Sequence, residues 1–257
     1  MRLLPEQFAG WAELGWLLLP GALDDRLLDE LRAGVDELRR WAAGDGPGLH
    51  HFEQTDAGPA LARSELFADD QAVLGAFIRS GVVPGLLEQL FGQPAVLFKE
   101  KVNYKAPGGA GFAPHQDATA YRFVEHHISV MVPLDPATSA SGCLWFAPGH
   151  GRGRLPTEAG NRIAPEVVAQ LAWQPVEAHP GDLVVFDSYA PHHSGTNTTD
   201  RSRVALYLTY NAASDGDQRA TYYADKQAEL AAGDGTFGNE RVRISVNDDF
   251  LGRPVVR

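Results

Sequence analysis

The spacing of apolar residues separates a stretch with helical periodicity from a later part with strand periodicity. From Leu23 to Trp41, apolar residues recur every three or four positions, which predicts an amphipathic helix. Asp24 and Asp25 favour its N-terminal end because carboxylates stabilise the positive end of a helix dipole. The Gly- and Pro-containing segment Gly44–Gly48 ends this helix, and a second helical stretch is expected from about Asp70 to Leu90.

Beyond Pro94 the chain changes to short apolar runs separated by turn residues. The clearest run, His127–Leu134, alternates with a period of two residues, as a strand does. Turn signals such as Pro148-Gly149 and Pro180-Gly181 separate the runs. The other elements expected are strands at Ala95–Tyr104, Leu144–Ala147, Leu183–Phe186 and Val204–Tyr210, and a final helix at about Gln218–Leu230. Helices followed by many short strands predict a mainly β fold with flanking helices, a barrel or jelly roll.

Length and composition indicate a single globular domain. The 257 residues show no fixed-period repeat and no low-complexity linker. We expect a helical N-terminal part at about 1–93, a jelly-roll core at about 94–211, and a C-terminal helix and tail at 212–257. The net charge of −11 argues against nucleic acid or an anionic membrane as a partner. Oligomeric state is not readable from the sequence.

Cysteine content and the N-terminus bear on the compartment. With Cys143 as its one cysteine, the chain has no disulfide framework and no Cys-type zinc site. Cys143 lies in an apolar run and is expected to be a buried, inert side chain. The N-terminus lacks the pattern of a signal peptide, and the apolar stretch Trp16–Leu19 is too short to span a bilayer. A reduced, cytoplasmic setting is therefore the default expectation.

Two segments carry residues suited to metal binding. In His115-Gln116-Asp117, the imidazole and the carboxylate are two positions apart, so on a strand both point to the same face. A His-x-Asp triplet alone is weak evidence. Farther along, an apolar run at 181–186 is followed by His192 and His193, either of which could complete a two-histidine, one-carboxylate set. Such a set leaves open positions on iron(II), whereas a structural zinc site leaves none.

Arg203 is a candidate partner for an organic acid beside this metal site. It lies eleven positions after His192, and its guanidinium matches the geometry of a carboxylate. Ser194 could donate a hydrogen bond to the same carboxylate. Taken alone, Arg203 is better explained as an ordinary surface arginine near Asp200.

Together these residues resemble the phytanoyl-CoA dioxygenase family of Fe(II)- and 2-oxoglutarate-dependent oxygenases. The resemblance consists of a His-x-Asp pair, then a distant His-x-Ser-x-x-Asn, then an arginine. Here those residues are His115, Asp117, His192, Ser194, Asn197 and Arg203. The resemblance implies a double-stranded β-helix, also called a jelly roll or cupin-like fold. In that pattern the serine and the asparagine both point back to His192 as the ligand, and His193 is expected not to bind metal.

The resemblance also implies roles for other residues. The cofactors would be Fe(II), 2-oxoglutarate and O2, with iron on His115, Asp117 and His192. The residues expected to bind 2-oxoglutarate are Arg203, Ser194, Asn103 and Thr119. The residues expected around the substrate are Phe112, Tyr121, Phe186, Lys99 and Lys101. Lys99 and Lys101 share one strand face, which faces either an anion in the barrel or solvent. A helix carrying Tyr222 could cover the mouth of the barrel.

The predicted reaction is hydroxylation of a small molecule. Related halogenases lack the carboxylate of the triad, so Asp117 favours hydroxylation or desaturation over halogenation. The segment Lys99–Gly142 resembles family members that hydroxylate small polar substrates, aminophosphonates among them, and no obvious basic patch for coenzyme A is visible. The alternatives are an oxygenase that tailors a natural-product intermediate, a metal-binding jelly roll without oxygenase activity, and a metal hydrolase.

Overall fold

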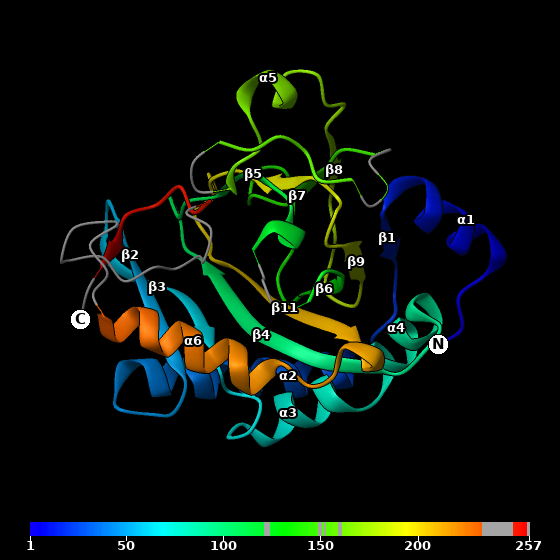
Figure 1. Cartoon of the computed structure of the whole chain (residues 1–257). Coiled ribbons are helices and arrows are strands. Elements are labelled where there is room, and N and C mark those ends of the chain that lie inside the picture. Colours follow the sequence, from blue (N-terminus) through cyan, green and yellow to red (C-terminus); the bar gives the residue numbers. More distant parts are fainter. Residues whose placement is uncertain (121–123, 149–150, 152, 159–160, 233–248, 256–257) are drawn as a thin grey trace.

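The computed structural model describes residues 1–120, 124–148, 151, 153–158, 161–232 and 249–255. Two β-sheets face each other, and helices cover the outside of the larger one (Figure 1). The helices are α1 (Pro5–Leu14), α2 (Asp25–Ala43), α3 (Ala72–Arg79), α4 (Val82–Phe91), α5 (Pro165–Val168) and α6 (Arg219–Ala232). This arrangement confirms the predicted mainly β fold with flanking helices, a jelly roll of the cupin type.

The large sheet has eight strands in the order β1-β9-β6-β11-β4-β3-β2-β12. The small sheet has four strands in the order β5-β10-β7-β8. The strands of the large sheet are β1 (Trp16–Leu19), β2 (Leu49–Thr55), β3 (Gly58–Glu65), β4 (Ala95–Lys105), β6 (His127–Pro133), β9 (Leu183–Asp187), β11 (Arg203–Ala212) and β12 (Pro254–Val255). Those of the small sheet are β5 (Phe112–His115), β7 (Leu144–Phe146), β8 (Gln174–Val176) and β10 (His192–Ser194).

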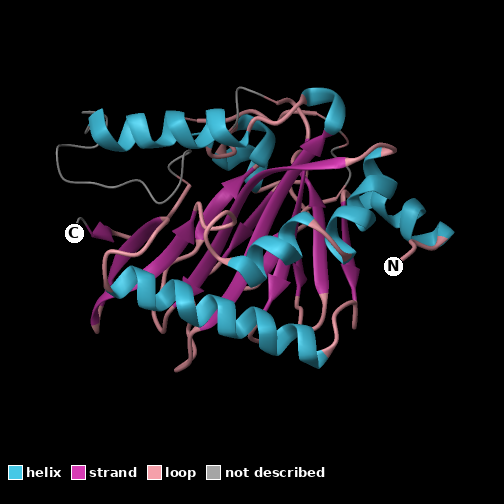
Figure 2. Cartoon of the chain, turned by 90° about the horizontal axis from the view of Figure 1, so that it is seen from below, coloured by secondary structure: helices cyan, strands magenta, loops and turns pink. Residues whose placement is uncertain are grey.

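The hydrophobic core has two layers, one on each face of the large sheet. On the outer face, Val130 and Leu206 pack with Leu31 and Leu38 of α2, and Figure 2 shows this helix lying across the sheet. On the inner face, Met131 packs toward the small sheet. All of β6 is therefore buried, although its sequence alternates, because both faces of the sheet are covered.

The N-terminal part differs from the prediction of a helical segment at about 1–93. Three of its segments, β1, β2 and β3, are strands of the large sheet. Their sequences are short or rich in polar residues, so neither a clear period of two nor a long apolar run marks them. Pairing with β9 and β4 determines their structure.

The predicted first helix and its end are confirmed. The Asp24 side chain accepts a hydrogen bond from the Leu27 amide at the start of α2, and Gly44 ends the helix. The second helical stretch is interrupted at Ser80-Gly81, where Gly81 has a φ of 95°. Residues Ala72–Phe91 are long and apolar enough to cross a membrane by length and composition alone. The core helices of globular proteins also meet these criteria of length and composition. Here the segment contributes to the core beneath the large sheet through Leu74, Ile78, Leu86 and Leu87.

Candidate active site

Two adjacent strands of the small sheet bring the candidate metal ligands together. His115 of β5 and His192 of β10 are partners in register, and their ring centroids lie 4.2 Å apart. Asp117 begins a short 3-10 helix directly after β5. The ligand atoms of His115, Asp117 and His192 all lie within 4.8 Å of one another. The donor set therefore fits one divalent cation on a single face.

Backbone carbonyls orient both histidines. Nδ1 of His115 lies 2.7 Å from the oxygen of Ala113, and Nδ1 of His192 lies 3.0 Å from the oxygen of Ala190. An Nδ1–H that donates to a carbonyl leaves Nε2 as the unprotonated donor for a metal. This pattern of carbonyl, imidazole and metal is usual in metal sites.

The charge states in the site also suit a cation. Burial lowers the pKa of His192 to about 4, and the neighbouring His115 adds to the effect, so the imidazole is neutral at physiological pH. Burial opposes ionisation of Asp117, but the nearby His192 and Lys99 outweigh it and hold the pKa of the carboxyl below its usual range. A neutral imidazole at His192 and an ionised carboxylate at Asp117 are the ligand states that iron(II) requires.

His193 points away from this set. Its ring stacks on Trp145 at 5.9 Å between centroids, and Trp173 meets it edge-on at 4.6 Å. Residues 192 and 193 are neighbours on a strand and so project to opposite faces. The metal-sized cluster accordingly includes His192 and not His193.

Arg203 and a second cation, Lys105, lie side by side at the end of the pocket beyond the histidines. They are register partners on β11 and β4, and both are buried. Arg203 donates to the Gly142 oxygen at 2.8 Å, and Lys105 donates to the Ser194 hydroxyl at 3.0 Å and to the Gly195 oxygen at 2.6 Å. Burial and the adjacent Arg203 hold the pKa of Lys105 well below its usual range. Both cations donate to neutral carbonyl and hydroxyl oxygens, and two such buried cations form a site for an anion.

The inward face of β4 supplies a row of polar side chains to the same pocket. Alternate residues of this strand line the pocket: Lys99, Lys101, Asn103 and Lys105. Lys99 and Lys101 therefore face inward and not toward solvent. Lys101 lies over the ring of Tyr207 at 5.2 Å. Burial lowers the pKa of Lys99 to about 8, although Asp117 acts in the opposite direction.

Arg63 of β3 extends this row of cations across the sheet. Its Cα is the register partner of Asn103, and its Nε donates to the Asn103 Oδ1 at 3.0 Å. The guanidinium also lies over the ring of Phe112, 5.4 Å from the centroid. Strand pairing therefore gathers Arg63, Lys99 and Lys101 in one pocket, although the sequence shows no obvious basic patch.

Of the other predicted site residues, some line this pocket and some do not. Phe112, Phe186 and Ser194 line the pocket. Thr119 is not among the lining residues of the described structure, because its hydroxyl donates to the Gln116 oxygen at 2.8 Å within the short helix. Tyr121 lies outside the described residues.

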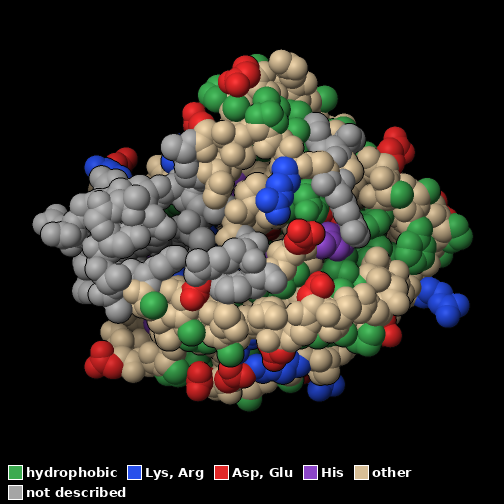
Figure 3. Space-filling view, viewed as in Figure 1, with side chains coloured by type: hydrophobic (Ala, Val, Ile, Leu, Met, Phe, Trp, Pro, Cys, Tyr) green, Lys and Arg blue, Asp and Glu red, His purple; other side chains and the backbone are tan. Residues whose placement is uncertain are grey.

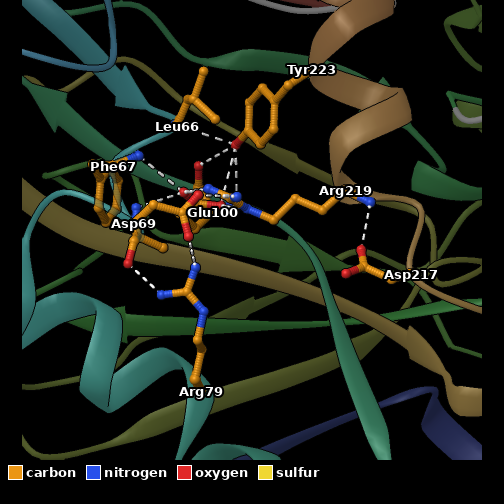
Figure 4. A network of polar contacts seen from close by, with 9 residues as sticks. Leu66, Phe67, Asp69, Arg79, Glu100, Asp217, Arg219 and Tyr223 are labelled. Carbon is orange, nitrogen blue, oxygen red and sulfur yellow. Dashed lines mark hydrogen bonds and ion pairs between the residues drawn. The ribbon is translucent and has the colours of Figure 1, made fainter.

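Helix α6 closes one side of the pocket through Tyr222, whose ring lies 5.8 Å from the Lys99 ammonium. A buried polar network fastens the start of this helix to β4 (Figure 4). Arg219 donates to both carboxylate oxygens of Glu100, and the Tyr223 hydroxyl donates to the Glu100 backbone oxygen. Figure 3 shows histidine, acidic and basic side chains near the centre of the face that Figure 1 presents.

The family model of phytanoyl-CoA dioxygenase (PhyH) matches residues 11–205, which include the three candidate ligands and Arg203. The chain belongs to this family. It is an oxidoreductase of the Fe(II)- and 2-oxoglutarate-dependent dioxygenase class, with iron and 2-oxoglutarate as cofactor and cosubstrate.

Two named relatives cover nearly all of the chain. It is 43% identical to methylphosphonate hydroxylase of Gimesia maris over 98% of its own length and 97% of that protein. It is 40% identical to 2-aminoethylphosphonate dioxygenase of the uncultured bacterium HF130_AEPn_1 over 88% of both chains. The crystal structure of EctD from S. alaskensis with 2-oxoglutarate and 5-hydroxyectoine shares the fold. Its TM-score is 0.71 at 20% identity, covering 83% of this chain and 77% of that one.

Proposed function

We propose that this PhyH-family dioxygenase hydroxylates a small phosphonate. The observation that carries the proposal is the group of cations, Arg63, Lys99 and Lys101, in the pocket that contains the metal triad. A phosphonate is a compact anion with three oxygens, and it suits several converging donors better than one. The two relatives of about 40% identity, each named for a phosphonate, support the same substrate class.

The donors of this pocket divide between two anions. Arg203, Lys105 and the Ser194 hydroxyl would hold the distal carboxylate of 2-oxoglutarate, and Arg63, Lys101 and Asn103 would hold the phosphonate. His115, Asp117 and His192 would hold iron through their converging Nε2 and carboxylate oxygens. When bound, iron with 2-oxoglutarate and O2 supplies the oxidising power for inserting oxygen into a substrate C–H bond.

The chain's own contribution to catalysis is positioning and charge. Arg63, Lys101 and Asn103 would fix the phosphonate group of the substrate. The carbon bonded to that group would then face the metal in one orientation. Tyr222 of α6 and Phe112 of β5 line the pocket and limit access of water to it. A binding module or a hydrolase would have no use for a second anion site with two buried cations beside the metal. That observation favours the oxygenase over both alternatives.

The first experiment combines one spectrum with one activity assay. Anaerobic addition of iron(II) and 2-oxoglutarate to the wild-type protein should give the visible charge-transfer band of a chelated keto acid. Succinate formation should then depend on an added phosphonate such as methylphosphonate or 2-aminoethylphosphonate. His192→Ala should lose both signals, whereas the matched control His193→Ala should keep them. A band in the wild type without turnover of any phosphonate would disprove the proposed substrate class and leave the oxygenase class intact.

We also propose a cytoplasmic location. It is supported by Cys143, the single cysteine of the chain, which is buried and free of any disulfide.

A further inference from the structure

Tyr207 lies between the two anion sites of the pocket. It is on the inward face of β11, four positions after Arg203, and it is the register partner of Lys101 on β4. Residues four positions apart on a strand have Cα atoms about 13 Å apart, so Arg203 and Tyr207 meet only where their side chains lean toward each other along the strand. Ala205, the residue between them on this face, has a methyl group that leaves room for this contact.

The hydroxyl of Tyr207 contacts the guanidinium that is proposed to hold the cosubstrate. Nη1 of Arg203 donates to this hydroxyl at 3.4 Å, and Nη2 of Arg203 donates to the Gly142 oxygen at 2.8 Å. The buried Nε of Arg203 has no hydrogen-bond partner among the described residues, so the guanidinium retains a donor for an anion.

A phenol that accepts a hydrogen bond still has its own proton to donate. The oxygen of Tyr207 accepts from Arg203, and its O–H therefore remains available as a donor. The accepted hydrogen bond polarises the phenol and strengthens it as a donor. A carboxylate held by Arg203 would lie beside this O–H and accept its hydrogen bond.

The ring of Tyr207 supports a cation of the proposed phosphonate site. The Lys101 ammonium lies over the ring, 5.2 Å from its centroid. The face of an aromatic ring is negative and attracts an ammonium, and the attraction is stronger where water is excluded. Tyr207 is 7% exposed, so this contact is largely shielded from water. The ring therefore fixes the position of the Lys101 ammonium in the pocket.

We infer that Tyr207 serves both anion sites: its hydroxyl donates a hydrogen bond to the distal carboxylate of 2-oxoglutarate beside Arg203, and its ring positions Lys101 for the phosphonate. The inference deepens the proposed function, and its second half rests on that function. The hydroxyl is a binding group for the cosubstrate, whereas the ring acts on the substrate through Lys101. Because the two roles belong to different atoms of one side chain, substitutions can remove them separately.

The test removes the hydroxyl and the ring one at a time. Tyr207→Phe loses the hydroxyl and keeps the ring, whereas Tyr207→Leu loses both. Tyr210→Phe is the matched control, because Tyr210 lies on the same strand but faces the outer core, where its hydroxyl donates to the Ile78 oxygen at 2.7 Å. Anaerobic titration of the iron(II) protein, followed by the visible charge-transfer band, gives the dissociation constant of 2-oxoglutarate. Calorimetry on the complex with iron(II) and saturating 2-oxoglutarate gives the dissociation constant of methylphosphonate.

The two substitutions should affect the two ligands differently. Tyr207→Phe should weaken 2-oxoglutarate binding by about 10- to 100-fold, as expected for one lost hydrogen bond to a charged group, and leave methylphosphonate affinity unchanged. Tyr207→Leu should weaken methylphosphonate binding as well, by about 2- to 30-fold, because the cation–π contact is lost. Tyr210→Phe should change neither affinity.

Each half of the inference has a result that overturns it. Unchanged 2-oxoglutarate affinity in Tyr207→Phe, or a loss confined to methylphosphonate, would overturn the role of the hydroxyl. Equal methylphosphonate affinity in Tyr207→Phe and Tyr207→Leu would overturn the role of the ring. If the wild type binds 2-oxoglutarate but neither methylphosphonate nor 2-aminoethylphosphonate, the proposed function fails and the role of the ring fails with it, while the 2-oxoglutarate titration still decides the role of the hydroxyl.

Discussion

Lys105 provides the sharpest test of the proposed 2-oxoglutarate site, because sequence patterns assign it no role. Its ammonium lies among the Ser194 hydroxyl and the Gly195 and Gly142 oxygens, at 3.0, 2.6 and 3.3 Å. The Lys105→Met variant keeps an unbranched side chain of similar length and removes only the charge and the donors. Lys105→Arg keeps the charge and is the matched control.

The magnitude follows from burial and from the neighbouring charge. Lys105 is 5% exposed and Arg203 is 2% exposed, so a bound carboxylate would interact with both in a site shielded from water. A hydrogen bond to a charged group in such a site is worth about 1.5–3 kcal/mol, which corresponds to a roughly 10- to 100-fold loss of 2-oxoglutarate affinity in Lys105→Met. Iron affinity should change little, because the Lys105 ammonium donates to Gly142, Ser194 and Gly195 and to none of the three metal ligands.

The pH dependence gives a second, independent signature. Burial and Arg203 lower the pKa of Lys105 in the free protein, and a bound carboxylate would raise it again. Binding of 2-oxoglutarate should therefore take up a proton, and its affinity should fall as pH rises between these two pKa values. Anaerobic calorimetry in buffers of different ionisation enthalpy measures the uptake. Equal affinity and equal proton uptake in wild type and Lys105→Met would refute the two-cation site.

Other expectations concern the remaining cations and the stability of the fold. Arg203→Met should raise the 2-oxoglutarate concentration needed for half-maximal turnover by about 10- to 100-fold with little change in the iron requirement, as measured by succinate formation; equal increases in both requirements would contradict the assignment. Arg219→Met leaves the buried Glu100 carboxylate without its bidentate partner and should cost about 3–5 kcal/mol of unfolding free energy in a urea titration, whereas a loss below 1 kcal/mol would show that the network contributes little. Lys226 donates to both oxygens of buried Glu65, whose pKa lies well below its usual range because Lys226 outweighs the effect of burial. The stability from this pair should be complete above the ordinary glutamate pKa and be lost as pH falls through the lowered one. Lys226→Met should flatten that acid-side slope, and an unchanged slope in acid unfolding curves would disprove the coupling.

The sequence predicts those parts of the molecule whose signals are local. The strands at β4, β6, β7, β9 and β11 fall close to their expected ranges, because each combines apolar residues with flanking turns. The metal cluster is likewise predictable, since the two members of His115-x-Asp117 are neighbours in the chain and the serine and asparagine after His192 identify the third member. The structure brings these three together as the pattern predicts.

Local sequence patterns do not predict which residues strand pairing brings into the pocket. Arg63 lies on β3, a segment whose polar sequence does not predict a strand, and its partner Asn103 is 40 positions away. Asp249 reaches the pocket because its backbone pairs with β5, a strand that is distant from Asp249 in the sequence. Lys105 could have been found from the alternation of Lys99, Lys101 and Asn103, which continues to position 105, once that face was known to be the inner one.

The overall charge of the chain says little about the charge inside its pocket. The chain carries a net charge of −11, yet Arg63, Lys99, Lys101, Lys105 and Arg203 all line one pocket. Surface charge acts through water and salt, whereas a buried pocket has a low effective dielectric and is controlled by its nearest groups. The acidic surface can thus disfavour nucleic acid and large polyanions while the pocket still attracts small ones. Because the cations line one buried pocket, the proposed substrate, a compact phosphonate, would reach them more easily than a bulky coenzyme A thioester would.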